Sequence, residues 1–240
     1  MKISVVIAAY NEEKLIGRCL KAILMQEYLR EDFEIIVIDN NSTDNTRKIA
    51  KELGITPLVY KDQQGAVWAK NYGAQQARGN IVAITDADSV PRSDWLQNIE
   101  LLMKNEKIKC VGGIVVSMDG KRLSFALLKI FSYIATVLQP LGIPLIWGSN
   151  MAFKNEVFKK VGGFNTQLNM CDDAEFVLRV QKKYGLRSVV YSKKLFVRVS
   201  PRKLEKINDF TPYFFGGLAS LIAIFIFRKS MSFGTNTAVR

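Results

Sequence analysis

Short apolar runs alternate with helical patterns over the first 90 residues of the chain. The apolar runs, most of them rich in β-branched residues, cover residues 3–9, 33–40, 55–61 and 81–85. Residues 15–24 place apolar side chains on one helix face, and residues 65–78 also have a helical pattern. Strands that are apolar on both faces and alternate with helices are typical of a parallel sheet covered on both sides. The pattern therefore predicts an α/β fold with a mostly parallel, Rossmann-like sheet.

Polar side chains follow three of these predicted strands at the point where each strand ends. Tyr10 and Glu12 follow the first, Asp39 ends the second, and Asp86 and Asp88 follow the fourth. In open parallel sheets the ligand crevice lies at the carboxyl ends of the strands. We therefore expect these side chains to meet at one edge and form a binding site. The polar residues at any one strand end, taken alone, would equally fit a helix cap or a turn.

The composition narrows the chemistry that such a site could perform. The chain has no histidine, which excludes Ser-His and Cys-His mechanisms and most zinc sites. Acid–base catalysis must then use carboxylates, lysine or tyrosine. Three widely spaced cysteines show no metal or disulfide pattern, as expected in a reducing compartment. The net charge of +12 favours an anionic partner: nucleotide phosphates, nucleic acid or an anionic membrane.

Asp86 and Asp88 form a D-x-D pair. Alternate carboxylates can turn toward one point, and their oxygens suit Mg²⁺ or Mn²⁺ bound together with substrate phosphates. Such a cation would neutralise a diphosphate and make it a better leaving group. D-x-D alone is common in surface loops, so it needs support from other motifs. The chain lacks GxxxxGK[ST], and no G-x-G-x-x-G follows the first strand, which argues against P-loop and dinucleotide-binding proteins.

Five blocks occur in order along the chain: VVIAAYNEE, VIDNNSTDNT, GAVWAKNYGAQQARGNIVAITDADSVP, GGF and CDDAEFVLR. In this order and spacing they resemble the family 2 glycosyltransferases of the GT-A fold, over residues 3–190. Five ordered blocks are a more specific signal than any single motif. The resemblance implies a GT-A fold and transfer of a sugar from a nucleotide-sugar donor. It also implies inversion at the anomeric carbon and a divalent cation, Mn²⁺ or Mg²⁺.

The resemblance also assigns roles around the nucleotide. Ala9 and Tyr10 match the pair that flanks the base, with Tyr10 stacking on it. Glu12 matches a glutamate beside the nucleotide. Asp39 matches the acid that hydrogen-bonds the base, most often uracil, so UDP is the favoured donor nucleotide.

Further blocks supply the phosphate and metal positions. Gly65 and Lys70 match a block usually written G-x-x-x-A-R-N, with lysine in place of arginine. Lysine can meet a phosphate as a point charge but lacks the bidentate fork of arginine. Asp86 matches the acid that touches the ribose or the sugar, and Asp88 matches the metal ligand. Some relatives add a later histidine to the metal; here the metal would depend on diphosphate and water oxygens.

The acceptor side carries the expected base. Asp172 and Asp173 match the family's Glu-Asp pair, so Asp173 would accept the proton of the acceptor hydroxyl and Asp172 would touch the acceptor. Both residues would also suit the first turn of the helix that follows. Trp147 and Asn150 lie in a region that lines the acceptor and sugar pocket in the family. Trp147 is equally compatible with the core, where aromatic residues are common.

The C-terminal region predicts contact with a membrane. Residues 211–227 are uncharged and have basic residues on both sides. As a helix they would extend about 25 Å, short of the roughly 30 Å hydrocarbon core. A buried helix, an interfacial helix and a single membrane span all fit this segment, and residues 125–147, apolar but broken, would suit the interface. We expect the N-terminus to form the first strand of the domain and not a signal peptide, because its apolar run is short and polar residues follow at once. We therefore expect an enzyme at the cytoplasmic face of the cell membrane, acting on a lipid or saccharide acceptor.

These expectations divide the chain at residue 207. Residues 1–207 would form the GT-A domain, with a nucleotide-sugar half (1–117) and an acceptor half (118–207), and residues 208–240 would form the apolar segment. One alternative is a sugar nucleotidyltransferase, which normally has a G-x-G-T-R-type loop where this chain has AAYNEE. A second alternative is a non-catalytic nucleotide- or nucleic-acid-binding protein. The basic residues show no RNA motif, so we expect no nucleic-acid partner.

Overall fold

The computed structural model describes residues 2–118, 130, 132–135, 137, 146–168, 171–200 and 202. The predicted apolar segment at 211–227, the boundary at 207 and most of residues 125–147 lie outside the described residues. Within the described part of the chain, no helix is both long and apolar enough to cross a bilayer.

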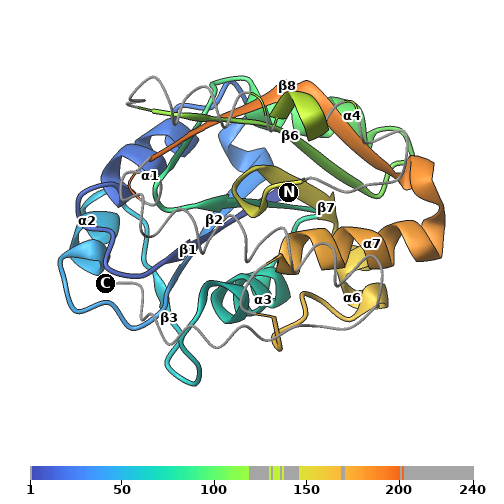
Figure 1. Ribbon diagram of the computed structural model, residues 1–240. Helices are drawn as coiled ribbons and strands as arrows, with labels where there is room; N and C mark the ends of the chain where they lie inside the picture. Colours follow the sequence, from blue (N-terminus) through green and yellow to red (C-terminus); the bar gives the residue numbers. More distant parts are fainter. Residues whose placement is uncertain are drawn as a thin grey trace.

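A single eight-stranded sheet forms the centre of the described part of the chain. Its strands are β1 (Ile3–Ala9), β2 (Phe33–Asp39), β3 (Leu58–Val59), β4 (Ile81–Asp86), β5 (Ser89–Pro91), β6 (Cys110–Ser117), β7 (Met151–Lys154) and β8 (Val189–Val199). Their order across the sheet is β3-β2-β1-β4-β7-β6-β8-β5 (Figure 1). The helices are α1 (Ile16–Leu24), α2 (Thr46–Glu52), α3 (Ala66–Gln76), α4 (Trp95–Met103), α6 (Asn155–Val161) and α7 (Asp172–Tyr184).

The sheet is parallel in one half and mixed in the other. β1 pairs in parallel with β2 and β4, and β2 pairs in parallel with β3. β7 is antiparallel to both of its neighbours, β4 and β6, and β5 is antiparallel to β8. β6 and β8 are again parallel. The predicted α/β class is confirmed, and the prediction of parallel strands holds for the nucleotide half but only in part for the second half.

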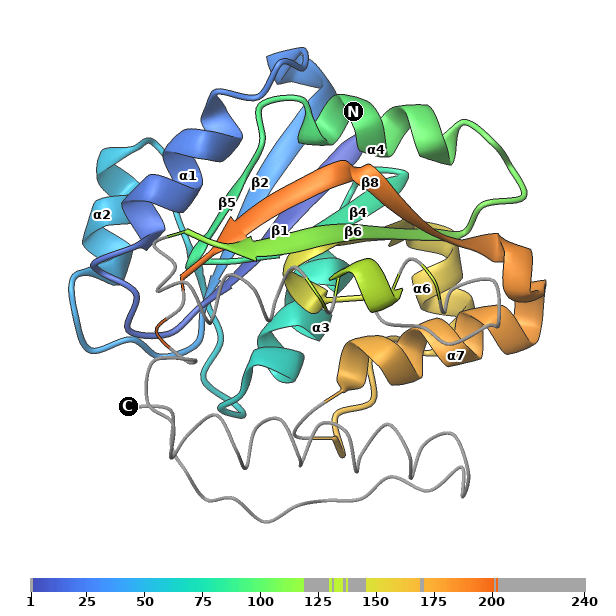
Figure 2. The ribbon, with the colours of Figure 1, turned by 45° about the horizontal axis from the view of Figure 1, so that its top comes forward.

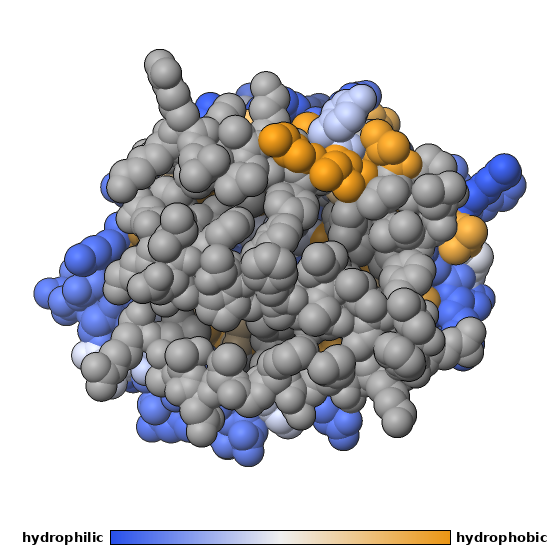
Figure 3. All heavy atoms as spheres, viewed as in Figure 1, coloured by the Kyte–Doolittle hydropathy of each residue, from blue (hydrophilic) through white to orange (hydrophobic). Residues whose placement is uncertain are grey.

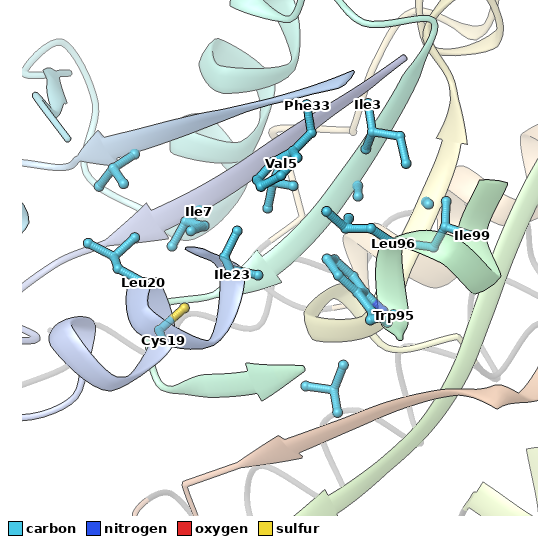
Figure 4. Close-up of a cluster of buried hydrophobic side chains, with 14 of the residues drawn as sticks. Ile3, Val5, Ile7, Cys19, Leu20, Ile23, Phe33, Trp95, Leu96 and Ile99 are labelled. Atoms are coloured by element: carbon cyan, nitrogen blue, oxygen red, sulfur yellow. The ribbon is translucent and has the colours of Figure 1, made fainter. Parts of the chain in front are cut away.

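Helices cover both faces of the sheet, as the apolar character of its strands predicts (Figure 2). The side chains of β1 alternate between two cores. Ile3, Val5 and Ile7 pack with residues of α1 and α4, including Trp95 (Figure 4). Val6 points to the opposite face, where α3, α6 and α7 pack.

Helix α3 lies close to the sheet because Gly73 has no side chain. A Cβ atom at Gly73 would lie 2.4 Å from Val6 Cγ1 and 2.9 Å from Ile38 Cγ1. Interiors are close-packed, so a larger residue would push the helix outward. This contact holds the first turns of α3, which carry Lys70 and Asn71, against the carboxyl edge of β1 and β2.

Candidate functional site

The polar residues at the strand ends lie side by side. Parallel pairing places Ala9 opposite Asp39 and Ala8 opposite Asp86. The prediction that the carboxyl ends of these three strands meet at one edge of the sheet is therefore confirmed.

Asp39 is fully buried at this edge. Its Oδ2 accepts the Ser42 N–H at 3.2 Å and lies 3.3 Å from Arg47 Nε. Its Oδ1 is buried and has no hydrogen-bond partner among the described residues. Leaving a buried acceptor unpaired is costly. The oxygen is therefore placed to accept a hydrogen bond from a ligand N–H group, such as that of a nucleobase.

Asn40 closes the loop beside Asp39. Its Nδ2 donates to the carbonyls of Tyr60 at 3.1 Å and Gln63 at 2.9 Å, and its Oδ1 accepts the Gly65 N–H at 2.7 Å. Gly65 has φ 144°, a conformation that favours glycine. The predicted site residue Gly65 thus lets the chain turn from this loop into α3.

The first strand tip is tied to the loop after β2. The Asn11 N–H donates to Ser42 Oγ at 3.0 Å, and the Glu12 N–H donates to Thr46 Oγ1 at 2.7 Å. Ala9 is buried and Tyr10 is half-buried beside this turn. These two hydrogen bonds hold the backbone of the turn, and Tyr10 lies in this turn at the edge of the site.

Carboxylates gather next to this turn. Asp88 is buried, Asp86 is half-buried, and Glu12 Oε2 is buried with no hydrogen-bond partner in the described part of the chain. One nitrogen of Arg202, Nη2, hydrogen-bonds Glu12 Oε1 and lies 3.7 Å from Asp88 Oδ2.

These carboxylates suit a hard divalent cation, because carboxylate oxygens are its preferred ligands. In addition, Glu12 Oε2 has no hydrogen-bond partner among the described residues. Among the described residues, no three His, Cys, Asp or Glu side chains form a group that could hold a metal. A cation at Asp88 would therefore need oxygens from the donor and from water.

The second acidic pair begins α7. Asp173 Oδ1 accepts the Ala174 N–H at 2.8 Å, and Oδ2 accepts the Gly148 N–H at 2.7 Å. Burial, and then the charge of Asp172, raise the pKa of Asp173 to about 6, although Lys70 and the two N–H groups oppose this shift. Such a carboxylate is mostly ionised at neutral pH and holds a proton better than an ordinary aspartate, as a general base requires.

Lys70 belongs to the same cluster. It is buried, and its Nζ lies 3.7 Å from Asp172 Oδ2, a buried oxygen without a hydrogen-bond partner among the described residues. A Cβ atom on Gly148 would lie 2.7 Å from Lys70 Nζ and 3.4 Å from Asp173 Oδ2. The structure thus places Lys70 beside the acidic pair. Its predicted contact with phosphate stays a prediction.

Asn71 connects the two halves of the site. Its Nδ2 donates to the Phe164 carbonyl at 2.9 Å, and its Oδ1 accepts the Phe164 N–H at 2.8 Å. The GGF block therefore docks on α3. Arg179 of α7 donates to the carbonyl of Gly163 at 2.7 Å and fixes that helix to the same block.

The two residues predicted before the GGF block have different environments. Trp147 is half-buried next to Gly148, outside the fully buried core. Asn150 is fully buried: its Oδ1 accepts the Trp95 Nε1–H at 2.9 Å, and its Nδ2 donates to the carbonyls of Ile114 and Leu195. The structure gives Asn150 a role inside the core, linking α4, β6 and β8. Its predicted contact with the acceptor and sugar pocket stays a prediction.

We predict that Asn150→Ala destabilises the fold by at least about 2 kcal/mol, because it leaves the buried indole N–H and two carbonyls unpaired. The free energy of unfolding in urea measures this loss. Gln97→Ala, at an exposed position of α4, is the control and should change it by less than about 0.5 kcal/mol. Equal stabilities of the two variants would contradict the structural role of Asn150.

We predict that Asp173 titrates near pH 6, and that Lys70→Met raises this pKa. The positive charge of Lys70 stabilises the carboxylate, so without it the proton is held to higher pH. The ¹³C shift of the carboxyl carbon as a function of pH measures the effect. Lys182→Met, on an exposed part of α7, is the control. A pKa that is the same in Lys70→Met and in the unmodified protein would rule out this charge interaction.

The chain resembles known proteins in sequence and in fold. A family model described as "Glycosyl transferase family 2" matches residues 4–162. A curated relative, the glucosyl-dolichyl phosphate glucuronosyltransferase of Haloferax volcanii, is 24% identical over 230 residues, which cover 88% of this chain and 72% of the relative. Three other curated relatives are 29–35% identical to this chain, and the match covers only 39–46% of their length.

Solved structures share the fold. The mannosyltransferase PcManGT from Pyrobaculum calidifontis, in complex with GDP-Man and Mn²⁺, has a TM-score of 0.77 and 23% identity, and the match covers 96% of this chain and 65% of that one. Residues 1–349 of S. aureus TarS, in complex with UDP-GlcNAc, have a TM-score of 0.68 and 21% identity, covering 97% of this chain and 68% of that one.

Proposed function

The chain belongs to glycosyl transferase family 2, and on that premise we propose that it moves a sugar from a nucleotide-diphosphate sugar to an acceptor hydroxyl or phosphate, with inversion. The observation that carries this proposal is the half-buried Asp173, whose carboxylate accepts the Gly148 and Ala174 N–H groups and whose pKa is raised to about 6. Family membership argues against the nucleotidyltransferase and the non-catalytic alternatives.

The unsatisfied Oδ1 of Asp39 supports binding of a nucleobase that offers an N–H group. Uracil and guanine both do so. UDP is the nucleotide we favour, from the resemblance of Asp39 to the family's base-binding acid. The neighbours' complexes contain GDP-Man in one case and UDP-GlcNAc in the other, so both nucleotides belong in the test.

Asp88 would hold the metal, and the unsatisfied Oε2 of Glu12 lies on the same side of the site. When bound, Mn²⁺ or Mg²⁺ would neutralise charge on the departing diphosphate. Asp86, at the end of β4, would contact the ribose or the sugar.

Asp173 would accept the proton of the acceptor hydroxyl while that oxygen attacks the anomeric carbon. The bond from that carbon to the diphosphate breaks on the opposite face, so the configuration inverts and the nucleoside diphosphate leaves. The N–H groups of Gly148 and Ala174 fix the direction of the carboxylate. An acceptor phosphate would already be ionised and would need this base less.

An exposed apolar surface supports a lipid-linked acceptor. The described residues among 130–137 are helical, and Ile130, Ile134 and Val137 expose 54%, 37% and 54% of their surface. Ser132 anchors this segment by hydrogen bonds to the backbone of Val115. Figure 3 shows apolar side chains gathered on the upper part of one face of the molecule. Together with the net charge of +12, this surface suits an anionic membrane.

The first experiment is calorimetry of UDP, GDP and CMP binding, each with and without Mn²⁺. We expect one nucleoside diphosphate to bind with Mn²⁺, and we expect Asp88→Asn to abolish the metal-dependent part, because the carboxylate oxygen is lost. Glu52→Gln, at an exposed position of α2, is the control. Normal metal-dependent nucleotide binding by Asp88→Asn would contradict the assignment of Asp88 as the metal ligand. The absence of binding by every nucleotide would sink the transferase proposal.

We further predict that Asp173→Asn keeps the donor affinity but lowers the turnover number by about 10²–10⁴, the usual contribution of a general base. Sugar transfer from the donor identified by calorimetry to a polyprenyl phosphate and to glycolipid acceptors measures this. Glu52→Gln again serves as the control. If Asp173→Asn keeps full turnover on hydroxyl acceptors, another residue must be the base.

A further inference from the structure

The end of β8 places Arg202 beside the carboxylates of the site. Val199 pairs with Ser89 across β8 and β5. The Ser200 N–H donates to the Asp88 carbonyl at 3.0 Å, and the Arg202 N–H donates to Ser200 Oγ at 3.4 Å. Backbone contacts therefore fix where the side chain of Arg202 starts, directly next to Asp88.

One guanidinium nitrogen lies between two carboxylates. Nη2 of Arg202 hydrogen-bonds Glu12 Oε1 and lies 3.7 Å from Asp88 Oδ2. The side chains of Glu12 and Asp88 are only 13% and 8% exposed, whereas that of Arg202 is 44% exposed. Two enclosed carboxylates need a positive charge nearby. The half-exposed arginine supplies one.

We propose that Arg202 is a tethered cation that occupies the metal-binding carboxylates until a nucleoside diphosphate arrives, so that metal and nucleotide binding depend on each other. This inference rests on the proposed function. It assigns to a side chain the place that a divalent cation would take at Glu12 and Asp88.

Competition for the same oxygens supports this coupling. The guanidinium of Arg202 already contacts Glu12 Oε1 and lies near Asp88 Oδ2. A divalent cation at these carboxylates would compete with the guanidinium for these oxygens. The oxygens of a diphosphate can accept the guanidinium instead, because arginine pairs well with phosphate. Metal alone should therefore bind weakly, and metal with nucleotide should bind tightly.

The test is a binding cycle for Mn²⁺, with free Mn²⁺ measured by electron paramagnetic resonance. Each protein is titrated without nucleotide and with UDP or GDP, whichever binds in calorimetry. The proteins are the unmodified chain, Arg202→Gln and Arg198→Gln. Arg198 is the matched control because it is an exposed arginine of β8, the strand that leads to Arg202.

In the unmodified chain we expect the nucleotide to strengthen Mn²⁺ binding strongly. In Arg202→Gln we expect Mn²⁺ alone to bind at least about fivefold more tightly, and the strengthening by nucleotide to fall, because coupling is reciprocal. Arg198→Gln should match the unmodified chain.

Two results would overturn the inference. The first is Mn²⁺ binding by Arg202→Gln alone that is no tighter than in the unmodified chain. The second needs no variant: equal Mn²⁺ affinity of the unmodified chain with and without nucleotide. If Mn²⁺ and nucleotide bind together but Arg202→Gln behaves as the unmodified chain does, only this inference fails. If the unmodified chain binds neither, the proposed function fails with it.

Discussion

The parallel pairing of β1 with β2 and β4 determines where the site forms. It sets Ala9, Asp39 and Asp86 in one row at the carboxyl edge. A slip of one residue would turn Val6 and its neighbours to the wrong face. Both faces of β1 are buried, so such a slip would cost the packing of two cores. Packing of the apolar core therefore fixes the strand register, and with it the positions of the polar residues at the carboxyl edge.

The second half of the site is joined to this edge by a few short contacts. Asn71 holds the GGF block through both polar atoms of its side chain, and the Gly148 N–H meets Asp173. Lys70 lies against the acidic pair from α3. The Gly148 and Ala174 N–H groups each donate to one oxygen of the Asp173 carboxylate and fix its direction, while burial raises its pKa.

Elements with a long periodic pattern could be predicted from the sequence, and short or non-local features could not. β1, β2, β4, α1 and α7 follow their apolar spacing, whereas β7 has only four residues and no distinctive pattern. Asn150 lies two residues beyond Gly148, but the short 3₁₀ turn there directs it into the core. Arg202 lies in a basic stretch that gives no local signal. Only the pairing of β8 with β5 brings it to Asp88. The predicted roles of the site residues rest on the resemblance and await experiment.

Two buried carboxylate oxygens without a hydrogen-bond partner among the described residues occur at the carboxyl edge of the sheet: Glu12 Oε2 and Asp39 Oδ1. Each lowers the stability of the ligand-free protein, because a buried acceptor has lost its water without gaining a donor. A ligand that supplies the donors or a cation recovers this energy. The folded chain should then resist heat and proteases better when substrates are plentiful, since binding to the native state alone raises its stability. The lifetime of the protein would thereby follow the supply of its donor.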